Sequence, residues 1–362
     1  QLDASQSVAS SNILWNLFMN MNMNCTNCNS FNNRTEVCPV KSQPIFISVL
    51  ISLFLLLGFF LNIFSMWVFK YRTPEWKSGT VLQFHLAISD LTFCPLAPFL
   101  AVYFAMGDWP FGRDMCRLKI VLMIVHFYGN IFFLTLISIH RYISVVYHSQ
   151  ESRMKQKDFV KKLCIGVWAV VLIKGVVCSL LLDVSTVEKH TLCLSIHQEQ
   201  YMKVYFFANF ILLLPGFLIP FTISLVCYSR LARSMSGINI CHQKGKLMKS
   251  KSCKMVAVCL LIFGLCFTPI NVIRTVVVVV KKFYPENCRL LLHVETSYYV
   301  SWILSSANCC LDPLIYCFAS QKFMGAFRSS LRKIGVRFQT IREDMENESA
   351  VSTHVVPTPR TI

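Results

Sequence analysis

Long apolar stretches alternate with short polar ones along this chain, and the pattern repeats seven times. A helix needs about 20 mostly apolar residues to cross roughly 30 Å of hydrocarbon, and each stretch reaches that length. The pattern therefore predicts an all-α membrane protein whose core is a bundle of seven transmembrane helices. We expect the spans at 44–69, 81–104, 118–139, 163–182, 204–231, 255–280 and 296–318.

Composition supports the membrane as the solvent. Apolar residues make up 54% of the 362 residues and charged residues only 15%, which argues against two soluble domains. The formal net charge of +17 would suit a nucleic-acid-binding protein. However, the basic residues gather at the ends of the predicted spans, where they meet anionic lipid. We therefore expect membrane lipid, and not a nucleic acid polymer, as their partner.

The orientation follows from the basic residues, because cytoplasmic segments hold the excess of Lys and Arg. This excess lies after spans one, three, five and seven, which places the amino terminus outside and the carboxyl terminus inside. We expect an extracellular segment at 1–43, a seven-helix membrane domain at 44–318 and a cytoplasmic segment at 319–362. The polar start shows no cleavable signal pattern, so the first span is expected to act as the signal anchor.

Cysteines on the outer side predict disulfides, because that compartment is oxidising. Cys116 begins span three and Cys193 lies in the loop after span four, so a bond between them would pin this loop over the bundle. Cys38 and Cys288 are expected to tie the amino-terminal segment to the last outer loop. The pairing of the remaining outer cysteines is left open; they are Cys25 and Cys28.

Glycosylation is expected on the same side. Asn24 and Asn33 each begin an Asn-x-Thr tripeptide in the outer segment. Asn347 begins a similar tripeptide, but it lies on the inner side, where we expect no modification.

Polar side chains within the predicted spans are costly in hydrocarbon and indicate function. Two are carboxylates, in spans two and seven, and three are amides, in spans one, three and seven. They either hydrogen-bond to one another between helices or form a hydrated site for a cation such as sodium. The set is Asp90, Asp312, Asn62, Asn130 and Asn308. No other metal site and no cofactor is expected.

Each predicted span contains a short motif of its own at a particular depth. Arg141 ends span three within His140-Arg141-Tyr142, and prolines at 220, 269 and 313 predict kinks in three neighbouring helices. The motifs are Asn62, Leu-Ala-Ile-Ser-Asp90, Trp109 with Cys116, His-Arg141-Tyr, Trp168, Pro220 with Tyr228, Phe263 with Cys266-Phe267-Thr268-Pro269, and Asp312-Pro313-Leu-Ile-Tyr316.

In order and spacing this set resembles rhodopsin-class G-protein-coupled receptors. The resemblance implies a plasma-membrane receptor that activates a heterotrimeric G protein, with a short amphipathic eighth helix from Phe323. It also implies receptor kinase and arrestin as partners of the Ser- and Thr-containing tail. The residues implied in coupling and switching are Arg141, Tyr142, Tyr228, Phe263, Phe267, Pro269, Asp312, Pro313 and Tyr316.

Three departures from the usual family pattern narrow the resemblance. His140 stands where an acidic residue usually precedes the arginine, Phe267 where tryptophan is usual, and Asp312 where asparagine is usual. Together these variants resemble the nucleotide (purinergic) branch and its relatives. Since His140 is not an acid, other contacts are expected to hold the resting state.

The ligand is expected to be an anion, because the outer halves of the spans carry cations and span three has no acid at the matching depth. Arg274 occupies the position that the resemblance gives to the anion-binding residue of nucleotide receptors. Tyrosines and a tryptophan would pack against the rest of the ligand. The expected ligand residues are Arg274, Lys174, Lys119, Lys203, Tyr128, Asn271, Tyr298, Tyr299 and Trp302.

Two positions argue against the nucleotide. Asn271 replaces an expected histidine and Trp302 an expected basic residue. The alternatives are a lipid mediator, a hydroxycarboxylic acid or dicarboxylate, and a peptide or protease-generated ligand.

Other classes of membrane protein fit less well. A transporter should show internal repeats, and none is evident. An enzyme should show nucleophile, base or metal-ligand spacing such as His-Glu-x-x-His, and the sequence contains none, so no enzymatic activity is expected.

Overall fold

The computed structural model describes residues 45–73, 75–146, 152–181, 184–187, 190–193, 202–236, 243–319, 323–325, 327–330 and 332–333. The chain divides into two compact units, Gln1–Cys38 and Pro39–Ile362, and every described residue belongs to the second. Several predictions fall outside the described residues, namely those for Asn24, Cys25, Cys28, Asn33, Cys38 and Asn347.

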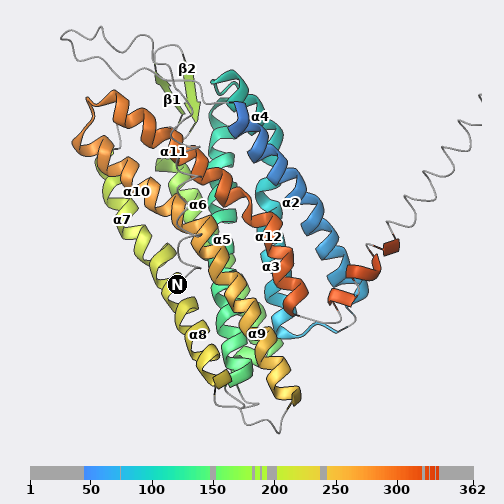
Figure 1. Ribbon diagram of the computed structural model, residues 1–362. Coiled ribbons are helices and arrows are strands. Elements are labelled where there is room, and N and C mark those ends of the chain that lie inside the picture. Colours follow the sequence, from blue (N-terminus) through green and yellow to red (C-terminus); the bar gives the residue numbers. More distant parts are fainter. Residues whose placement is uncertain are drawn as a thin grey trace, which may run out of the picture. The chain divides into compact units, whose positions relative to one another are not determined.

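Long helices lying side by side form the described part of the second unit (Figure 1). The first four predicted spans are helical, and each helix extends past its predicted range on at least one side. Their helices are α2 (Ile45–Arg72), α3 (Ser78–Phe93) with the turn η1 (Cys94–Leu96) and α4 (Ala97–Met106), α5 (Gly112–Val146), and the turn η2 (Arg153–Lys155) followed by α6 (Lys157–Leu181).

The remaining three predicted spans are interrupted helices, with colours from yellow to red in Figure 1. The fifth and sixth each contain a π-helical segment, whereas the seventh breaks at Ala307. They are α7 (Met202–Leu213), η3 (Leu214–Leu218) and α8 (Ile219–Ser236); α9 (Gln243–Ile262), η4 (Phe263–Phe267) and α10 (Thr268–Phe283); and α11 (Cys288–Ser306) with α12 (Asn308–Ala319).

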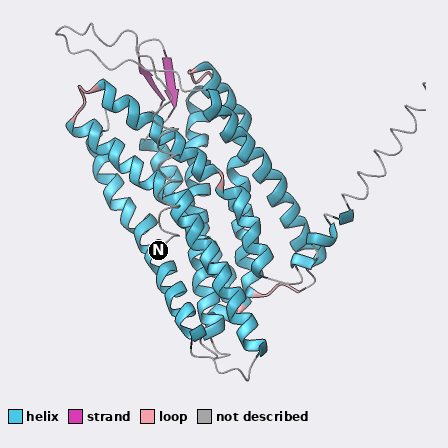
Figure 2. Cartoon of the chain, in the orientation of Figure 1, coloured by secondary structure: helices cyan, strands magenta, loops and turns pink. Residues whose placement is uncertain are grey.

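Within the described residues, six helical stretches are each long and apolar enough to cross a membrane. The seventh predicted span is the α11–α12 pair, in which α12 has 12 residues and α11 carries the charged residues Arg289 and Glu295. Helix dominates the described chain (Figure 2), in agreement with the predicted all-α class.

Proline explains the interruptions in spans five and six. Each π-helical segment ends within two residues of a proline, Pro220 or Pro269. Proline has no N–H and its ring clashes with the carbonyl four residues earlier, so the preceding turn widens. The hydroxyl of Thr268 donates to the carbonyl of Phe263 over 2.9 Å and satisfies one group that the distortion frees. The predicted kinks at these two prolines coincide with the π-helical segments, whereas Pro313 lies inside helix α12.

A two-stranded hairpin lies at one end of the bundle. Its strands, β1 (Val184–Val187) and β2 (His190–Cys193), are antiparallel, with Val184 opposite Cys193. The predicted disulfide between Cys116 and Cys193 joins β2 to the first turns of α5, with the Cα atoms 5.6 Å apart. Cys288 is also disulfide-bonded, and its predicted partner Cys38 lies outside the described residues.

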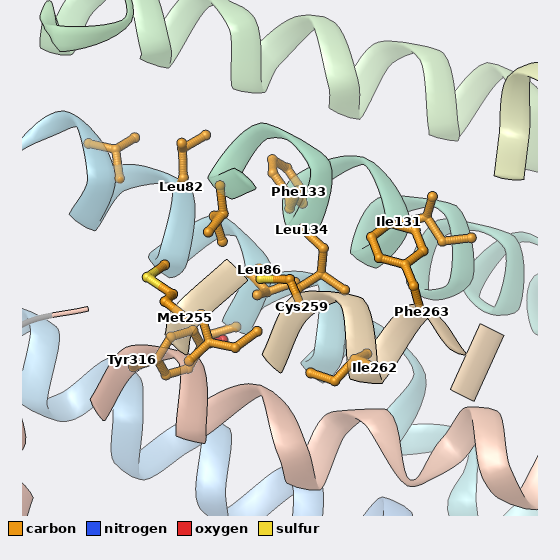
Figure 3. Packing of buried hydrophobic residues seen from close by; sticks show 14 of the residues in the cluster. Leu82, Leu86, Ile131, Phe133, Leu134, Met255, Cys259, Ile262, Phe263 and Tyr316 are labelled. Atoms are coloured by element: carbon orange, nitrogen blue, oxygen red, sulfur yellow. The ribbon is translucent and has the colours of Figure 1, made fainter. Parts of the chain in front are cut away.

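The hydrophobic core of one half of the bundle is built around α5, which packs against α3, α6, α8 and α9. Figure 3 shows apolar side chains from α3, α5, α9 and α12 meeting there, with Tyr316 beside Met255. Both side chains are buried. A second buried cluster lies nearer the hairpin and includes Trp109 and the cysteines of the disulfide.

Residues 323–325, 327–330 and 332–333 are helical, as expected for the eighth helix. Phe323 is buried, and its ring lies 4.7 Å from that of Phe69 and 6.0 Å from that of Tyr316. Arg328 on the same segment is exposed. The segment therefore has one buried apolar side and one exposed polar side.

Candidate functional site

A cavity lies between α3, α5, α10 and α11. Most of its lining is aromatic or aliphatic. The lining residues are Phe93, Met123, Ile124, His126, Phe127, Tyr128, Ile270, Arg274, Tyr298, Trp302, Ser305 and Ser306. Arg274 is the one Lys or Arg among these described lining residues.

The guanidinium of Arg274 is held by three neighbours. Its Nε donates to Oδ1 of Asn209 over 2.9 Å, one terminal nitrogen donates to the hydroxyl of Tyr128 over 3.2 Å, and the other donates to Oδ1 of Asn271 over 3.1 Å. Asn209 is fixed in turn by donating to the hydroxyl of Thr275 over 3.1 Å. Such contacts restrict the rotamers of a long side chain, so the charge is held at a defined place in the wall.

Tyr128 separates Arg274 from a second cation. The ammonium of Lys174 lies 3.0 Å from the centre of the Tyr128 ring, which places the ring between the two charges. Gly216, in the π-helical segment η3, leaves room for this arrangement: a Cβ there would lie 2.6 Å from Cε1 of Tyr128 and 3.3 Å from Nζ of Lys174. Lys174 itself does not line the cavity.

The predicted ligand residues other than Lys174 divide into three groups. Tyr128, Arg274, Tyr298 and Trp302 line the cavity, and Asn271 lies behind Arg274 as its acceptor.

The second group, Lys119 and Tyr299, lies nearer the hairpin and outside the cavity lining. The ammonium of Lys119 is buried, 4.8 Å and 5.0 Å from the ring centres of Tyr103 and Trp109, and donates to the carbonyl of Cys193 over 3.3 Å. The ring of Tyr299 packs against that of Phe104 at 5.4 Å. This geometry fits a structural role for Lys119 better than the predicted contact with ligand.

The third group is Lys203, which is exposed and lies apart from the cavity lining. Its place fits a basic residue at the membrane surface.

Several residues of the site were not predicted from the sequence. His126 and Phe127 sit within the same turn of α5 as Tyr128, and helical spacing alone placed Tyr128 without showing which neighbours share its face. Asn209 is an amide in an apolar span, which was a usable signal for a polar contact. Ser305 and Ser306 gave no signal, because small hydroxyl residues are common in membrane helices.

A chain of aromatic rings leads from the cavity into the core. The ring of Phe127, in the cavity wall, lies 5.3 Å from that of Phe267, and Phe267 lies 6.1 Å from Phe263. Phe263 then lies 5.9 Å from Phe221 on α8. These edge-to-face and tilted contacts place the predicted toggle residue Phe267 directly behind the cavity wall.

At the opposite half of the bundle the predicted switch residues lie in closely packed surroundings. Tyr316 is fully buried, with its ring 5.2 Å from that of Phe69. Arg141 is half-buried near the end of α5, and Tyr228 packs against a small cluster of Val145, Leu231 and Val256. This half is therefore filled by side chains in the described residues.

The predicted polar cluster is also brought together by the fold. Asn130 donates to Oδ1 of Asp90 over 2.8 Å, Asn308 donates to Oδ2 of Asp312 over 3.1 Å, and Asn62 donates to the carbonyl of Cys309 over 2.8 Å.

Some oxygen atoms of this cluster accept no hydrogen bond from the described residues. Among the described residues, one oxygen each of Asp90, Asn130, Asn308 and Asp312 is buried without a hydrogen-bond partner. Carboxylate and amide oxygens are the ligands that hard cations prefer, so these groups fit a sodium ion.

Known proteins are similar to this chain over most of its length. Residues 61–316, more than half of the chain, match the profile of the 7 transmembrane receptor (rhodopsin family). Purinoceptor 4 of Mus musculus is 34% identical over 285 residues, covering 76% of this chain and 76% of that protein. Lysophosphatidic acid receptor 6 of Gallus gallus is 30% identical over 273 residues, covering 74% and 88%. Purinoceptor 2 of Mus musculus is 29% identical over 319 residues, covering 84% and 85%.

Proposed function

This chain belongs to the rhodopsin family of seven-transmembrane receptors, and we propose that it binds an extracellular anionic small molecule, a nucleotide first among them, at Arg274. As a member of that family it is a multi-pass membrane receptor that couples to a heterotrimeric G protein, and it is not an enzyme. The position of Arg274 in the cavity wall carries the ligand proposal.

A fixed guanidinium is suited to an anionic oxygen. Its three nitrogens already donate to uncharged oxygens of Tyr128, Asn209 and Asn271. A phosphate or carboxylate oxygen is a stronger acceptor than these neutral groups, and it would gain charge-assisted hydrogen bonds from the same fork. The aromatic wall, including Tyr298 and Trp302, would pack against a nucleobase.

A lysophospholipid or related anionic lipid is the second candidate, because the lining is mainly apolar. Apart from the one cation, side chains such as Met123, Ile124 and Ile270 offer surface to hydrocarbon. Relatives named as lysophosphatidic acid receptors support this candidate, as the purinoceptor relatives support the nucleotide. Hydroxycarboxylic acids and dicarboxylates share the anionic group and complete the test panel.

Coupling would run along the aromatic chain. A ligand that pulls Arg274 toward α5 favours one position of α10, and α10 continues through the π-helical segment η4 into α9. Phe267 and Phe263 lie in that segment. A shift there would move α9 away from α5 and open the packed half around Arg141 and Tyr316 for a helix of the G protein. A ligand shifts this equilibrium only by its difference in affinity for the two arrangements.

The proposal includes the orientation and the remaining partners expected from the sequence. The excess of Lys and Arg supports a cytoplasmic carboxyl terminus and an extracellular amino terminus with glycans at Asn24 and Asn33. The tail beyond residue 340 combines Ser and Thr with acidic residues, which supports phosphorylation by a receptor kinase and binding of arrestin.

The experiment measures calcium and cyclic AMP responses in cells that express the full chain. The panel holds nucleotides, lysophosphatidic acids, oxidised fatty acids and small carboxylates, each applied to the native receptor and to Arg274→Ala. Loss of charge-assisted bonds worth about 1.5–3 kcal/mol would weaken the active anion at least about tenfold.

Arg289→Ala is the matched control, because Arg289 is an exposed arginine at the start of α11 outside the cavity lining. It removes the same charge and should leave potency unchanged. A response that survives Arg274→Ala, or one that Arg289→Ala weakens equally, would contradict the proposed site.

A further inference from the structure

His126 contributes a polar group to an otherwise apolar part of the cavity wall. Its ring stacks on that of Phe93 at 5.6 Å with an interplanar angle of 16°, and both residues line the cavity. The residue is only 4% exposed. Its Nε2 is buried and, among the described residues, has no hydrogen-bond partner. Leaving such a group unpaired costs about 1–3 kcal/mol, so a partner from the cavity would be favourable.

The other ring nitrogen lies near α3 and the polar cluster. Nδ1 lies 3.2 Å from Nδ2 of Asn130 and 3.3 Å from the carbonyl of Ser89. That carbonyl already accepts from the hydroxyl of Thr92 over 2.7 Å. Oδ1 of Asp90 is 3.9 Å from Nδ1, beyond the reach of a hydrogen bond. Nδ2 of Asn130 donates one hydrogen to Asp90 and has a second to give.

Nδ1 can accept the second hydrogen of the Asn130 amide, and in that tautomer the proton of the neutral imidazole sits on Nε2. The buried, unpaired atom of His126 is then a hydrogen-bond donor. A ligand group that meets it must be an acceptor.

We propose that His126 forms a second polar contact of the ligand site, which takes a carbonyl or hydroxyl oxygen at the end of the ligand remote from its anion. Ser305 and Ser306 line the same cavity from α11 and supply further hydroxyl groups. The ligand class is thus an anion with an apolar or ring-shaped body and an oxygen acceptor on that body. An oxo-nucleobase or a hydroxylated acyl chain has this form.

This inference deepens the proposed function, because the anion at Arg274 and the acceptor at His126 would belong to one ligand. The test is nevertheless separable from it. Uncharged fragments need no arginine, so they probe His126 alone. Cyclohexanone and methylenecyclohexane have nearly the same shape and differ in whether they carry an acceptor oxygen.

The experiment measures the thermal unfolding midpoint of the purified full-length receptor against increasing concentrations of each fragment. We expect cyclohexanone to bind about two- to tenfold more tightly than methylenecyclohexane, as one neutral hydrogen bond allows. Arg274→Ala should keep this difference. His126→Phe retains an aromatic ring beside Phe93 but has no donor, so the two fragments should become equivalent.

His126→Gln serves as the second variant, because its amide nitrogen lies the same number of bonds from Cβ as Nε2 and donates hydrogen bonds. It should retain a preference for cyclohexanone. Equal binding of the two fragments by the native receptor, or a preference that survives His126→Phe, would overturn the inference and leave the Arg274 site untouched. Failure of Arg274→Ala to weaken any anion would reject the proposed function and leave the His126 result standing.

Discussion

The imidazole Nε2 of His140 and the hydroxyl of Ser78 share a hydrogen bond of 2.9 Å, which joins the end of α5 to the first residue of α3. Both side chains are buried. The contact is tight on its other side too, because a Cβ on Gly79 would lie 2.9 Å from Cε1 of His140. At this position most members of the family carry an acid that restrains the neighbouring arginine, here Arg141. In this chain the hydrogen bond between His140 and Ser78 of α3 restrains the same end of α5.

Removing this bond is predicted to raise ligand-independent signalling. Ser78→Ala deletes the hydroxyl and costs the packed arrangement about 1 kcal/mol, a roughly fivefold shift in the population of the two arrangements. Basal binding of a labelled GTP analogue by membranes that contain the receptor would measure the change. Ser78→Thr keeps the hydroxyl and is the matched control. Unchanged basal activity in Ser78→Ala would mean that both arrangements contain the bond.

Lys119 provides a second test, because the sequence predicted a ligand contact and the fold places the residue elsewhere. Its ammonium lies between Tyr103 and Trp109 and donates to Cys193, in the strand that the disulfide holds. Lys119→Met keeps the length of the side chain and loses the charge.

We predict that this change lowers the unfolding free energy of the receptor by about 1–3 kcal/mol and leaves the potency of the active anion unchanged. A thermal unfolding curve and a concentration–response curve on the same preparation would separate the two effects. A variant of native stability with the weakened potency of Arg274→Ala would restore the ligand role.

Most of the fold could be predicted from the spacing of the apolar stretches and the positions of the motifs. Apolar length predicted all seven spans, and the depth of Pro220 and Pro269 predicted the distortions, because both properties depend only on local sequence. The π-helical form of those distortions was not predictable, since it depends on which neighbours satisfy the freed backbone groups.

The cavity was harder to predict, because it depends on how side chains from four helices rotate toward one another. Arg274 and Tyr128 were identified by charge and type, yet the sequence could not show that Tyr128 screens Lys174 from the cavity. It also left Lys119 and Lys174 as candidate ligand residues beside Arg274. Helical phase was known for each residue, but the rotation of each helix against its neighbours was not.

Sodium is predicted to oppose activation through the buried carboxylates. Asp90 and Asp312 are both fully buried within the membrane domain, and their unpaired oxygens fit a cation. Replacing choline chloride by sodium chloride at equal ionic strength should therefore reduce agonist potency in the native receptor.

Asp90→Asn should abolish that difference, and Glu286→Gln, which neutralises an exposed acid outside the bundle core, should retain it. The measurement is binding of the labelled GTP analogue in the two salts. Equal potencies in sodium and choline for the native receptor would favour the alternative expected from the sequence, in which these side chains only bond one helix to another.

Gly216 gives the sharpest prediction about the ligand wall. A Cβ there would lie 2.6 Å from Cε1 of Tyr128, closer than packed atoms allow, and 3.3 Å from Nζ of Lys174. Gly216→Ala must therefore displace the ring of Tyr128, at a cost of about 1–3 kcal/mol for an overpacked core. Since the hydroxyl of Tyr128 accepts from Arg274, displacement also removes one of the contacts that hold the guanidinium.

We expect Gly216→Ala to weaken the anionic agonist about tenfold or more, because both the wall and the orientation of Arg274 change. Gly166→Ala on α6 is the matched control: no atom lies within 4 Å of its added Cβ, and alanine favours helix over glycine. Potency should be native in that variant. If Gly216→Ala also kept native potency, Tyr128 would have room to move without disturbing Arg274, and its hydroxyl would have no part in positioning the anion site.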